Sequence, residues 1–344
     1  MSNMPDGFDI DIGVVGAGSW GTALANLLAE KGYPIDLWVF EQEICQQIVE
    51  SRENGVFLPG IHLSDNLRPS TDLAKVVRGK GLVLIVVPSH VMRVVAGQMA
   101  PDLEPEAIVV SASKGIENET LLTMSGVLKE AAADLSDDRL AVLSGPSFAK
   151  EVAMGVPTVV TVASKQETCA KMVQRVFATT AFRVYTNEDI MGVELGGAVK
   201  NVIAIAAGIV DGLGLGLNTR AALITRGQTE IRRLGLALGA NPRTFTGLAG
   251  IGDLVLTCTG DLSRNHMVGQ KIGQGQTLSQ VLAEMRMVAE GVKTARSVHN
   301  LAKRLGVEMP ISDAVYQVLH EDLSPKDALH QLMTRDLKHE LDER

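Results

Sequence analysis

The chain has 344 residues, of which 46% are hydrophobic and 21% charged, a composition typical of globular proteins and a length that favours two domains. Its net charge of −8 argues against nucleic acid or an anionic membrane surface as a partner. The three cysteines are far apart and lack metal-ligand spacing, and the N-terminal residues form no apolar segment, so we expect reduced thiols and a cytoplasmic protein without a signal peptide.

The first predicted elements surround a glycine-rich turn. A strand, the turn, a helix and a second strand are expected at residues 9–15, 16–21, 22–31 and 35–40. The turn has the GxGxxG spacing of dinucleotide-binding loops, in the strand-to-helix context that such loops require. Gly16 permits the tight turn, Gly18 lets the backbone approach a pyrophosphate, and Gly21 allows the helix to pack closely on the strand. The sequence therefore predicts a dinucleotide site at the start of this helix.

The end of the second strand bears on the choice of dinucleotide. Glu41 follows the strand and can accept a hydrogen bond from a ribose 2′-hydroxyl, which favours NADH. No Arg or Lys stands beside Glu41 to hold the 2′-phosphate of NADPH. Glu41 is equally well explained as a solvated residue in the first turn of the next helix, so the sequence leaves NADPH and NADH open.

Strands continue to alternate with helices through the first half of the chain. Further strands are expected at residues 82–87, 107–111, 140–143, 158–162 and 182–185, with helices near 91–99 and 167–177. This alternation predicts a doubly wound parallel sheet, in which ligands bind at the carboxyl ends of the strands. His90, Lys114 and Ser147 follow such ends. His90 is more readily explained as a loop residue, whereas Lys114, followed by glycine, is the stronger candidate for a site.

The second half of the chain shows helix after helix without a strand signal. We therefore expect an α/β dinucleotide-binding domain at residues 1–187 and an all-α domain at residues 188–344. Asn218 is expected to cap a helix that follows a glycine-rich helix end or bend at residues 212–216. Further helices are expected to begin at Ser263, Val292, Ser312 and Ser324-Pro325. Because Asp211 and several glycines interrupt the longest apolar run, no membrane-spanning segment is expected.

The first helix of this half carries an isolated lysine. The helical neighbours of Lys200 are Val193, Gly196, Gly197, Ile203, Ala204 and Ala207, none of which can pair with an ammonium. A helix this apolar is buried, and burial lowers a lysine pKa towards neutrality, where the amine can exchange a proton with a substrate. An ion pair with a distant carboxylate, or a side chain that reaches solvent, also explains Lys200. Gly196 and Gly197 favour the functional interpretation, because they leave space for a flat ligand.

Two later segments carry polar residues that fit the same site. Asp253 is the only charge in its own apolar run, so Asp253 and Lys200 can serve one site. Ser263 is a suitable helix cap, and Arg264 and Asn265 fall in the first turn, where backbone amides favour anions. An Arg in this position can hold a phosphate through two parallel hydrogen bonds, although a solvated Arg at a helix end has the same sequence.

Eight short motifs in fixed order carry a family resemblance. They are Gly16-Ala17-Gly18-Ser19-Trp20-Gly21, Val87-Pro88-Ser89-His90, Ser113-Lys114-Gly115, Ser144-Gly145-Pro146-Ser147-Phe148-Ala149-Lys150-Glu151, Leu195-Gly196-Gly197-Ala198-Val199-Lys200-Asn201, Gly250-Ile251-Gly252-Asp253-Leu254, Ser263-Arg264-Asn265 and Val288-Ala289-Glu290-Gly291. From about residue 10 to 335 the chain closely resembles the bacterial type of the NAD(P)-dependent glycerol-3-phosphate dehydrogenase family. The resemblance implies an N-terminal Rossmann domain, an all-helical C-terminal domain and a site in the cleft between them. It also implies a homodimer that interconverts dihydroxyacetone phosphate and sn-glycerol 3-phosphate for phospholipid synthesis.

The resemblance further implies which residues form the site. Lys200 would be the catalytic proton carrier to the ketone oxygen, with Lys114 as a second cation there. The dinucleotide, NADPH or NADH, would be bound by Gly16, Gly18, Ser19, Trp20, Gly21, Lys114, Ala149, Arg264, Val288 and Glu290. The substrate would be bound by Lys114, Gly145, Ser147, Lys200, Asp253, Ser263, Arg264 and Asn265. Phe40 departs from the family, in which His or Arg is common near the adenosine end of the cofactor.

Two other functions fit parts of this pattern. Another two-domain dehydrogenase, acting on a 3-hydroxy acid or a sugar-acid phosphate, can also use a lysine on the first interdomain helix, but a carboxylate substrate does not need the phosphate cradle of residues 263–265. A redox sensor that binds dinucleotide without turnover has no need for Lys114, Lys200 and Asp253 together. We expect a small-molecule substrate and no metal, because the sequence offers no His/Asp cluster for a metal ion.

Overall fold

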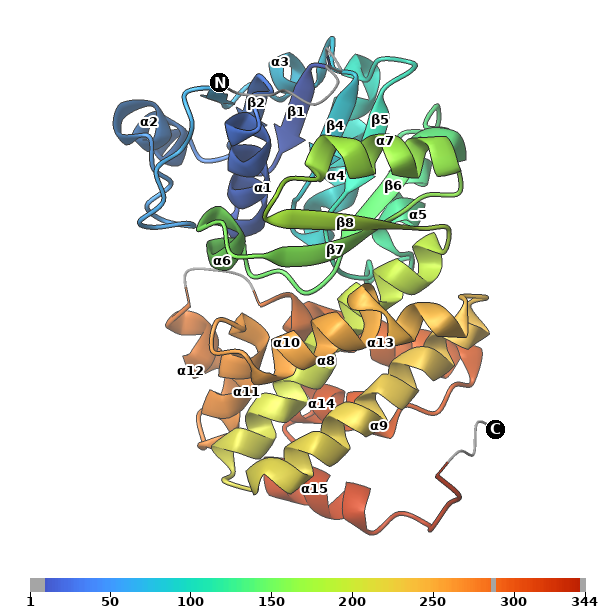
Figure 1. The fold of residues 1–344 in the computed structure, drawn as a ribbon. Helices are drawn as coiled ribbons and strands as arrows, with labels where there is room; N and C mark the ends of the chain where they lie inside the picture. Colours follow the sequence, from blue (N-terminus) through green and yellow to red (C-terminus); the bar gives the residue numbers. More distant parts are fainter. Residues whose placement is uncertain (1–9, 286–288, 341–344) are drawn as a thin grey trace.

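The computed structural model of the chain describes residues 10–285 and 289–340. A sheet flanked by helices forms the N-terminal part and a group of packed helices forms the C-terminal part, with α8 running from the sheet into the helices (Figure 1). The predicted fold class, a Rossmann-type α/β part followed by an all-α part, is confirmed.

Eight strands form one sheet in the order β3-β2-β1-β4-β5-β6-β7-β8. Their bounds are β1 Ile12–Val15, β2 Ile35–Trp38, β3 Leu67–Ser70, β4 Leu82–Ile85, β5 Ile108–Ser111, β6 Leu140–Ser144, β7 Thr158–Ala163 and β8 Phe182–Asn187. Strands β1, β2 and β4 are short runs in which every residue is buried, as expected in a sheet covered on both faces. The strand order reverses at β1, which pairs with β2 on one side and β4 on the other. Ligands bind beyond the carboxyl ends of the strands at such a switch point.

Two features of the sheet differ from the sequence-based prediction. The sequence does not predict β3, because Pro69 and its polar neighbours resemble a loop; β3 is an edge strand, where the missing N–H of a proline is tolerated. The sheet is also not parallel throughout, since β7 runs antiparallel to β6. The only helix between these two strands is α6, Ala149–Ala153. With five residues, α6 is too short to carry the chain back to the amino ends of the strands, as parallel pairing requires.

Helices cover both faces of the sheet. Besides α6 they are α1 Ser19–Glu30, α2 Gln42–Ser51, α3 Leu73–Val77, α4 Met92–Met99, α5 Met124–Ala131 and α7 Glu167–Phe177. Leu28 of α1 and Phe177 of α7 are fully buried in the core of one face. Met92 of α4 and Val127 of α5 are fully buried in the core of the other face. A core on each face is what doubly wound folds require, so this part of the prediction holds.

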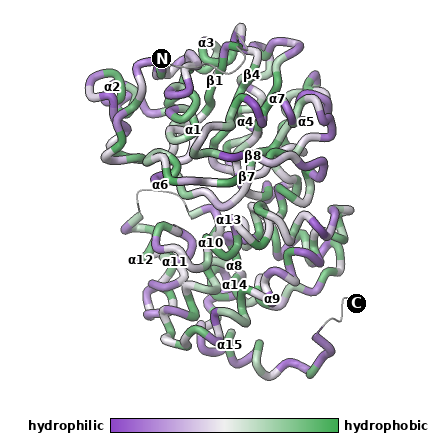
Figure 2. Tube along the Cα trace, in the orientation of Figure 1, coloured by the Kyte–Doolittle hydropathy of each residue, from purple (hydrophilic) through white to green (hydrophobic). Residues whose placement is uncertain are grey.

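The C-terminal part is built around α8, Ile190–Gly212. The helices that surround it are α9 Gly216–Ala237, α10 Asp253–Thr259, α11 Arg264–Gly273, α12 Leu278–Ala283, α13 Glu290–Leu305, α14 Pro310–His320 and α15 Pro325–Met333. Asp189 caps α8 by accepting a hydrogen bond from the Gly192 N–H at 2.9 Å, and residues 192–210 are all buried. The residues along α8 are accordingly mostly hydrophobic, as are those of the central strands (Figure 2). The domain division between residues 187 and 188 stays a prediction.

Helix α8 is long and apolar enough to cross a membrane by length and composition, so the expectation that no apolar run has this length is wrong. Its glycines do not interrupt the helix but let a neighbour approach. A Cβ on Gly208 would lie 2.0 Å from the carbonyl oxygen of His266, and a Cβ on Gly269 of α11 would lie 1.9 Å from that of Ile205. Helices α8 and α11 therefore pack backbone against backbone, and the whole apolar window of α8 is buried in protein.

The helix starts test the predicted caps. Ser263 and Ser324 accept hydrogen bonds from backbone amides in the first turns of α11 and α15, as predicted. Asn218 and Ser312 are not caps, because α9 and α14 each begin two residues before them. Ser312 instead donates its hydroxyl to the buried carboxylate of Glu230 on α9, at 2.8 Å. A polar residue near a helix start thus has two structural explanations that the sequence does not separate.

Candidate active site

The three glycines of the β1–α1 turn have the environments that dinucleotide binding requires. Gly16 has a φ of +114°, a backbone conformation that favours glycine. A Cβ on Gly21 would lie 1.9 Å from the Gly16 carbonyl oxygen, so α1 can pack this closely on the turn only without a side chain there. Nothing lies within 4 Å of the Cβ position of Gly18, so the backbone there is open to a ligand. Tight turn, close packing and open approach are the three glycine roles of such loops.

The residues that follow Gly18 also fit a dinucleotide. The indole N–H of Trp20 is buried and has no hydrogen-bond partner within the described part of the chain. A buried donor without a partner is costly, so this group is suited to an acceptor on a ligand. The Ser19 hydroxyl donates to the Phe57 carbonyl oxygen at 2.6 Å, which ties the start of α1 to the segment after α2. The turn and its neighbours therefore have the donors and the open backbone that a pyrophosphate group needs.

The other predicted cofactor contacts come from separate elements. Ala149 begins α6, which packs against α1. Glu290 begins α13, and its carboxylate accepts a hydrogen bond from the Ser89 hydroxyl, which follows β4, at 2.6 Å. A Cβ on Gly115 would lie 2.4 Å from the Cβ of Ser89. Three strand-end segments and α13 therefore meet near the switch point, while Val288 lies outside the described residues.

Phe40 and Glu41, just after the end of β2, supply no positive charge for a 2′-phosphate. Phe40 is 76% exposed and packs the edge of its ring against Trp38, with ring centroids 5.9 Å apart. Glu41 is exposed and precedes α2, and its side chain makes no capping hydrogen bond. These positions are compatible with a carboxylate facing a ribose, and the choice between NADPH and NADH stays open.

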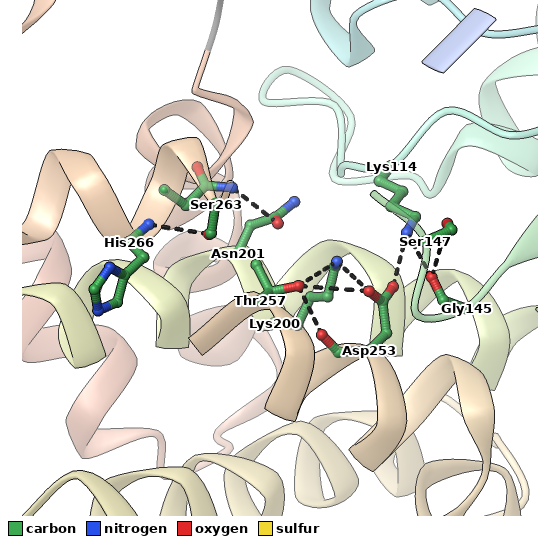
Figure 3. A network of polar contacts seen from close by, with 10 residues as sticks. Lys114, Gly145, Ser147, Lys200, Asn201, Asp253, Thr257, Ser263 and His266 are labelled. Carbon is green, nitrogen blue, oxygen red and sulfur yellow. Dashed lines mark hydrogen bonds and ion pairs between the residues drawn. The ribbon is translucent and has the colours of Figure 1, made fainter. Parts of the chain in front are cut away.

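Two lysines share one carboxylate where the sheet edge meets α8 (Figure 3). Lys200 of α8 donates to Asp253 Oδ1 and, at 2.6 Å, to Thr257 Oγ1. Lys114, which follows β5, donates to Asp253 Oδ2 at 2.7 Å and lies 3.4 Å from the Gly145 carbonyl oxygen. The predicted pairing of Asp253 with Lys200 is confirmed as a contact. Thr257 was not predicted from the sequence, although its position one helical turn after Asp253 on α10 was a usable signal.

The environment of Lys200 lowers its affinity for a proton. Burial lowers the pKa of Lys200 to about 8; the Asp253 carboxylate opposes this fall, and the positive charge of Lys114 adds to it. Burial also raises the pKa of the nearby Cys258 thiol to about 12, so this cysteine is neutral near pH 8. An amine with a pKa near the working pH can both donate and accept a proton, which is what general acid–base catalysis requires.

The two glycines before Lys200 have a different role from the one expected. A Cβ on Gly196 would lie 2.3 Å from the Ala249 carbonyl oxygen, and a Cβ on Gly197 would lie 2.7 Å from Ser144 Oγ. The space beside both glycines is therefore filled by protein, and the expectation that they make room for a flat ligand is wrong. They let α8 pack against the segment before α10 and against the end of β6, which brings Lys200 close to Asp253.

The predicted phosphate cradle lies at the start of α11, on the other side of Asn201 from Asp253 (Figure 3). Asn265 donates from Nδ2 to Asn201 Oδ1 at 2.9 Å and accepts from the Gly291 N–H, also at 2.9 Å. The Ser263 hydroxyl accepts from the His266 N–H at 3.2 Å as the helix cap. Asn201 belongs to the Lys200 motif, but no role was predicted for it from the sequence. These contacts fix the first turn of α11 against α8 and α13.

Arg264 supplies the positive charge of this cradle. The side chain is half-buried, and within the described part of the chain it makes no hydrogen bond or ion pair. Burial lowers the pKa of Arg264, and the charge of Glu290 opposes that fall. A partly buried guanidinium with no hydrogen bond to the described residues is suited to an anionic ligand, because its five donors match a phosphate.

The remaining predicted residues divide between this site and a second cavity. The Ser147 hydroxyl donates to the Gly145 carbonyl oxygen at 3.1 Å, which places both residues beside Lys114. His90 lines a separate cavity of about 360 Å³ with Glu117 and Lys293. Burial lowers the pKa of His90. Among the described residues no group of three or more His, Cys, Asp or Glu side chains is arranged to hold a metal ion.

Comparisons with known proteins agree with this geometry. The profile of the NAD-dependent glycerol-3-phosphate dehydrogenase N-terminus matches residues 11–170, and that of the C-terminus matches residues 189–330. The chain is 59% identical over 331 residues to a protein of Syntrophobacter fumaroxidans named glycerol-3-phosphate dehydrogenase (NAD(P)+), covering 96% of this chain and 97% of the relative. A protein of the same name from Geobacter sulfurreducens is 59% identical over 329 residues, covering 96% and 98% of the two chains.

A solved structure shows the same fold along nearly the whole chain. The crystal structure of glycerol-3-phosphate dehydrogenase from Coxiella burnetii superposes with a TM-score of 0.91 at 40% identity, covering 95% of this chain and 99% of that chain. Two family profiles, relatives at 59% identity and this likeness all point the same way. The chain belongs to the NAD-dependent glycerol-3-phosphate dehydrogenase family.

Proposed function

We propose that the chain interconverts dihydroxyacetone phosphate and sn-glycerol 3-phosphate with NADPH or NADH, and that the product serves phospholipid synthesis. The observation that carries the proposal is the buried Lys200 on α8, which shares Asp253 with Lys114 at the carboxyl edge of a dinucleotide-binding sheet. When bound, the nicotinamide supplies the hydride for reduction of the ketone carbon and accepts it in the reverse reaction. The chain's own residues bind the cofactor and the substrate, orient the ketone and exchange the proton.

Lys200 is the proton donor to the ketone oxygen. Negative charge develops on that oxygen during reduction, and the Lys200 ammonium neutralises it by giving up its proton. Lys114 stabilises the same oxygen as a second cation. Asp253 holds both amines, and the Thr257 hydroxyl fixes the direction of the Lys200 side chain, so that the donors are ordered before substrate arrives.

The cofactor is held by the turn after β1 and by the start of α13. The open backbone at Gly18 receives the pyrophosphate part of the dinucleotide, and the buried indole N–H of Trp20, unpartnered among the described residues, follows on the same turn. Glu290, fixed by the Ser89 hydroxyl, and Ala149 at the start of α6 line the same edge. The direct test is oxidation of NADPH and NADH, followed at 340 nm with dihydroxyacetone phosphate, beside a panel of 3-hydroxy acids and sugar-acid phosphates run in the oxidative direction. Turnover of that panel alone would reassign the substrate.

Arg264 binds the substrate phosphate and thereby orients the ketone towards Lys200. Replacement of Arg264 by alanine is expected to raise KM for dihydroxyacetone phosphate by roughly 10- to 100-fold, which corresponds to the net loss of one hydrogen bond to a charged group, about 1.5–3 kcal/mol. The effect on kcat is expected to be smaller, because the proton donor remains. Steady-state kinetics with saturating cofactor measures both constants, and Arg243, an exposed arginine outside the cradle, provides the control Arg243→Ala. An unchanged KM would place the phosphate elsewhere.

The proton affinity of Lys200 sets a pH dependence that differs between the two directions. Reduction needs protonated Lys200, so kcat/KM for dihydroxyacetone phosphate is expected to fall as the pH rises through the Lys200 pKa of about 8. Oxidation of glycerol 3-phosphate needs the neutral amine, so its kcat/KM is expected to rise over the same range. Profiles from pH 6 to about 10 in both directions check the sign. If kcat/KM changed in the same direction with pH for reduction and for oxidation, Lys200 would not be the proton carrier.

The cellular setting is part of the proposal. The chain acts on a soluble triose phosphate in the cytoplasm, without nucleic acid or membrane insertion, and works as a homodimer. The negative net charge of −8 supports the absence of a nucleic-acid partner, and the burial of its one long apolar helix among the described residues supports the absence of membrane insertion. The homodimer rests on the family resemblance alone. Light scattering at several protein concentrations measures the molar mass in solution. A mass equal to one chain at every concentration would contradict the homodimer.

A further inference from the structure

The segment that carries Lys114 is inserted into the helical part of the chain. This segment, residues 112–123, joins β5 to α5. Ile116 is 1% exposed and belongs to the hydrophobic core formed by the C-terminal helices. The Ile116 carbonyl oxygen accepts a hydrogen bond from the Ser297 hydroxyl of α13 at 2.9 Å. The strand-end residues around Lys114 are therefore anchored to the opposite part of the molecule.

A second anchor reaches the other end of the segment from α8. Glu194 is 6% exposed, and its carboxylate accepts hydrogen bonds from the Ser125 N–H at 2.7 Å and from the Ser125 hydroxyl at 2.5 Å. Ser125 lies in the first turn of α5, so the carboxylate also faces the positive end of that helix. Burial raises the pKa of Glu194, and the donors from Ser125 and Thr123 oppose the rise. Within residues 10–285 and 289–340 no cation pairs with Glu194, so its polar contacts all go to the end of this segment and the start of α5.

The segment between the two anchors is stiff. Residues Ile116 and Thr123 form an antiparallel bridge, and the Glu117 N–H donates to the Leu122 carbonyl oxygen at 2.9 Å. Arg93 of α4 holds the Glu117 carboxylate at 2.7 Å. Because its two ends are hydrogen-bonded to each other, a shift at Thr123 moves Ile116 as well, and Lys114 is two residues from Ile116.

We propose that Glu194 is a positioning residue that holds Lys114 in reach of the carboxylate it shares with Lys200. Glu194 lies six residues before Lys200 on the same unbroken helix, or about 9 Å along its axis. One rigid element thus fixes Lys200 directly and Lys114 through Ser125. The proposal rests on the roles proposed above for the two lysines, and it concerns only how their separation is maintained.

The chain contains a matched control for the loss of a buried carboxylate. Glu230 of α9 is 2% exposed and accepts hydrogen bonds from the Ile311 N–H at 2.6 Å and from the Ser312 N–H and hydroxyl at 3.0 and 2.8 Å. Like Glu194, it accepts hydrogen bonds from backbone N–H and from a serine hydroxyl in the first turn of a helix, with two backbone donors where Glu194 has one. Both partners lie within the helical part, however, so Glu230 cannot affect the separation of the lysines in the same way.

The experiment compares Glu194→Ala, Glu194→Gln and Glu230→Ala in thermal unfolding and in the pH dependence of kcat/KM for dihydroxyacetone phosphate reduction. Both alanine variants are expected to lower Tm. Only Glu194→Ala is expected to lower kcat/KM, by about 10- to 100-fold, since displacing a site residue by about 1 Å has an effect of that size. It should also move the upper pH limb to higher pH, because Lys200 then loses the positive charge of Lys114 nearby. Glu194→Gln, which keeps one acceptor oxygen, should recover part of the activity.

A double-mutant cycle separates this proposal from the proposed roles of the lysines. If Glu194 acts through Lys114, Glu194→Ala adds little further loss in a Lys114→Ala background. Full additivity, or a Glu194→Ala variant with wild-type kcat/KM and pH limb, would show that Glu194 is only structural. If Glu194→Ala does not fold, Ser125→Ala and Glu194→Gln provide the same comparison. A wild-type chain that does not reduce dihydroxyacetone phosphate would instead contradict the proposed function, and with it the roles of both lysines on which the Glu194 proposal rests.

Discussion

Replacement of Lys200 by alanine is expected to lower kcat for dihydroxyacetone phosphate reduction by roughly 10²–10⁴-fold, the usual contribution of a positioned general acid. The alanine variant has no donor in place of the Lys200 ammonium, and among the described residues Asp253 keeps Lys114 as its ion-pair partner. Dinucleotide affinity should be kept, because the glycine turn lies on a different element. Initial rates at saturating substrate and a titration of NADPH or NADH fluorescence measure the two properties separately.

The control for this variant is a second buried lysine. Lys80 is 8% exposed and pairs with Asp36 at 2.5 Å, within the sheet part and near the amino ends of β4 and β2, away from the carboxyl ends where the site lies. Lys80→Ala therefore removes a buried ammonium of similar exposure without touching the site. It should lower Tm and leave kcat within about 2-fold, as expected of a residue outside the site. A Lys200→Ala enzyme with wild-type kcat would remove Lys200 from the chemistry.

Replacement of Asp253 by asparagine is expected to lower kcat/KM for reduction at pH 7.5 by roughly 10²-fold or more, on the scale of one catalytic proton-transfer group. The carboxylate raises the pKa of Lys200 against the effects of burial and of Lys114. Without the carboxylate that pKa falls further, and the amine is mostly neutral where it should donate a proton. The upper limb of the pH profile should therefore move to lower pH, opposite to the shift expected for Glu194→Ala.

Asp36 provides the comparison for Asp253. It too is a buried carboxylate between two cations, Lys80 at 2.5 Å and Arg68 at 3.0 Å. Asp36→Asn should lower the urea concentration at the midpoint of unfolding and leave the upper limb of the pH profile in place. If Asp253→Asn left the limb in place, the charge of Asp253 would not be what sets the proton affinity of Lys200.

Local patterns were sufficient to predict the nucleotide turn and the burial of Lys200. The roles of Gly16, Gly18 and Gly21 follow from the backbone geometry that a strand-to-helix turn imposes, wherever the rest of the chain goes. The burial of Lys200 follows from the apolar residues on every face of its helix. Asp253 could be connected with Lys200 because each is the only charge in its surroundings, although neither pattern specifies a distance.

Features that depend on contacts between distant segments could not be read in this way. The antiparallel direction of β7 depends on how far α6 carries the chain, and β3 is an edge strand whose pairing overrides its loop-like composition. The spaces beside Gly196 and Gly197 look open in the sequence, because the atoms that fill them come from residues 249 and 144. The contact of Glu194 with Ser125 likewise joins residues that share no local pattern.

The close contact between α8 and α11 has a consequence for substrate length. The carbonyl oxygens of His266 and Ile205 lie where side chains would be on Gly208 and Gly269, so the two backbones are in direct contact at these positions. Lys200 projects from α8 and Arg264 from α11. We therefore expect the packing of the two helices to keep the distance between these side chains constant. If Lys200 and Arg264 act as proposed, a phosphorylated ketone whose carbonyl and phosphate match that distance is expected to engage both residues, whereas a homologue one carbon longer is expected to engage only one of them.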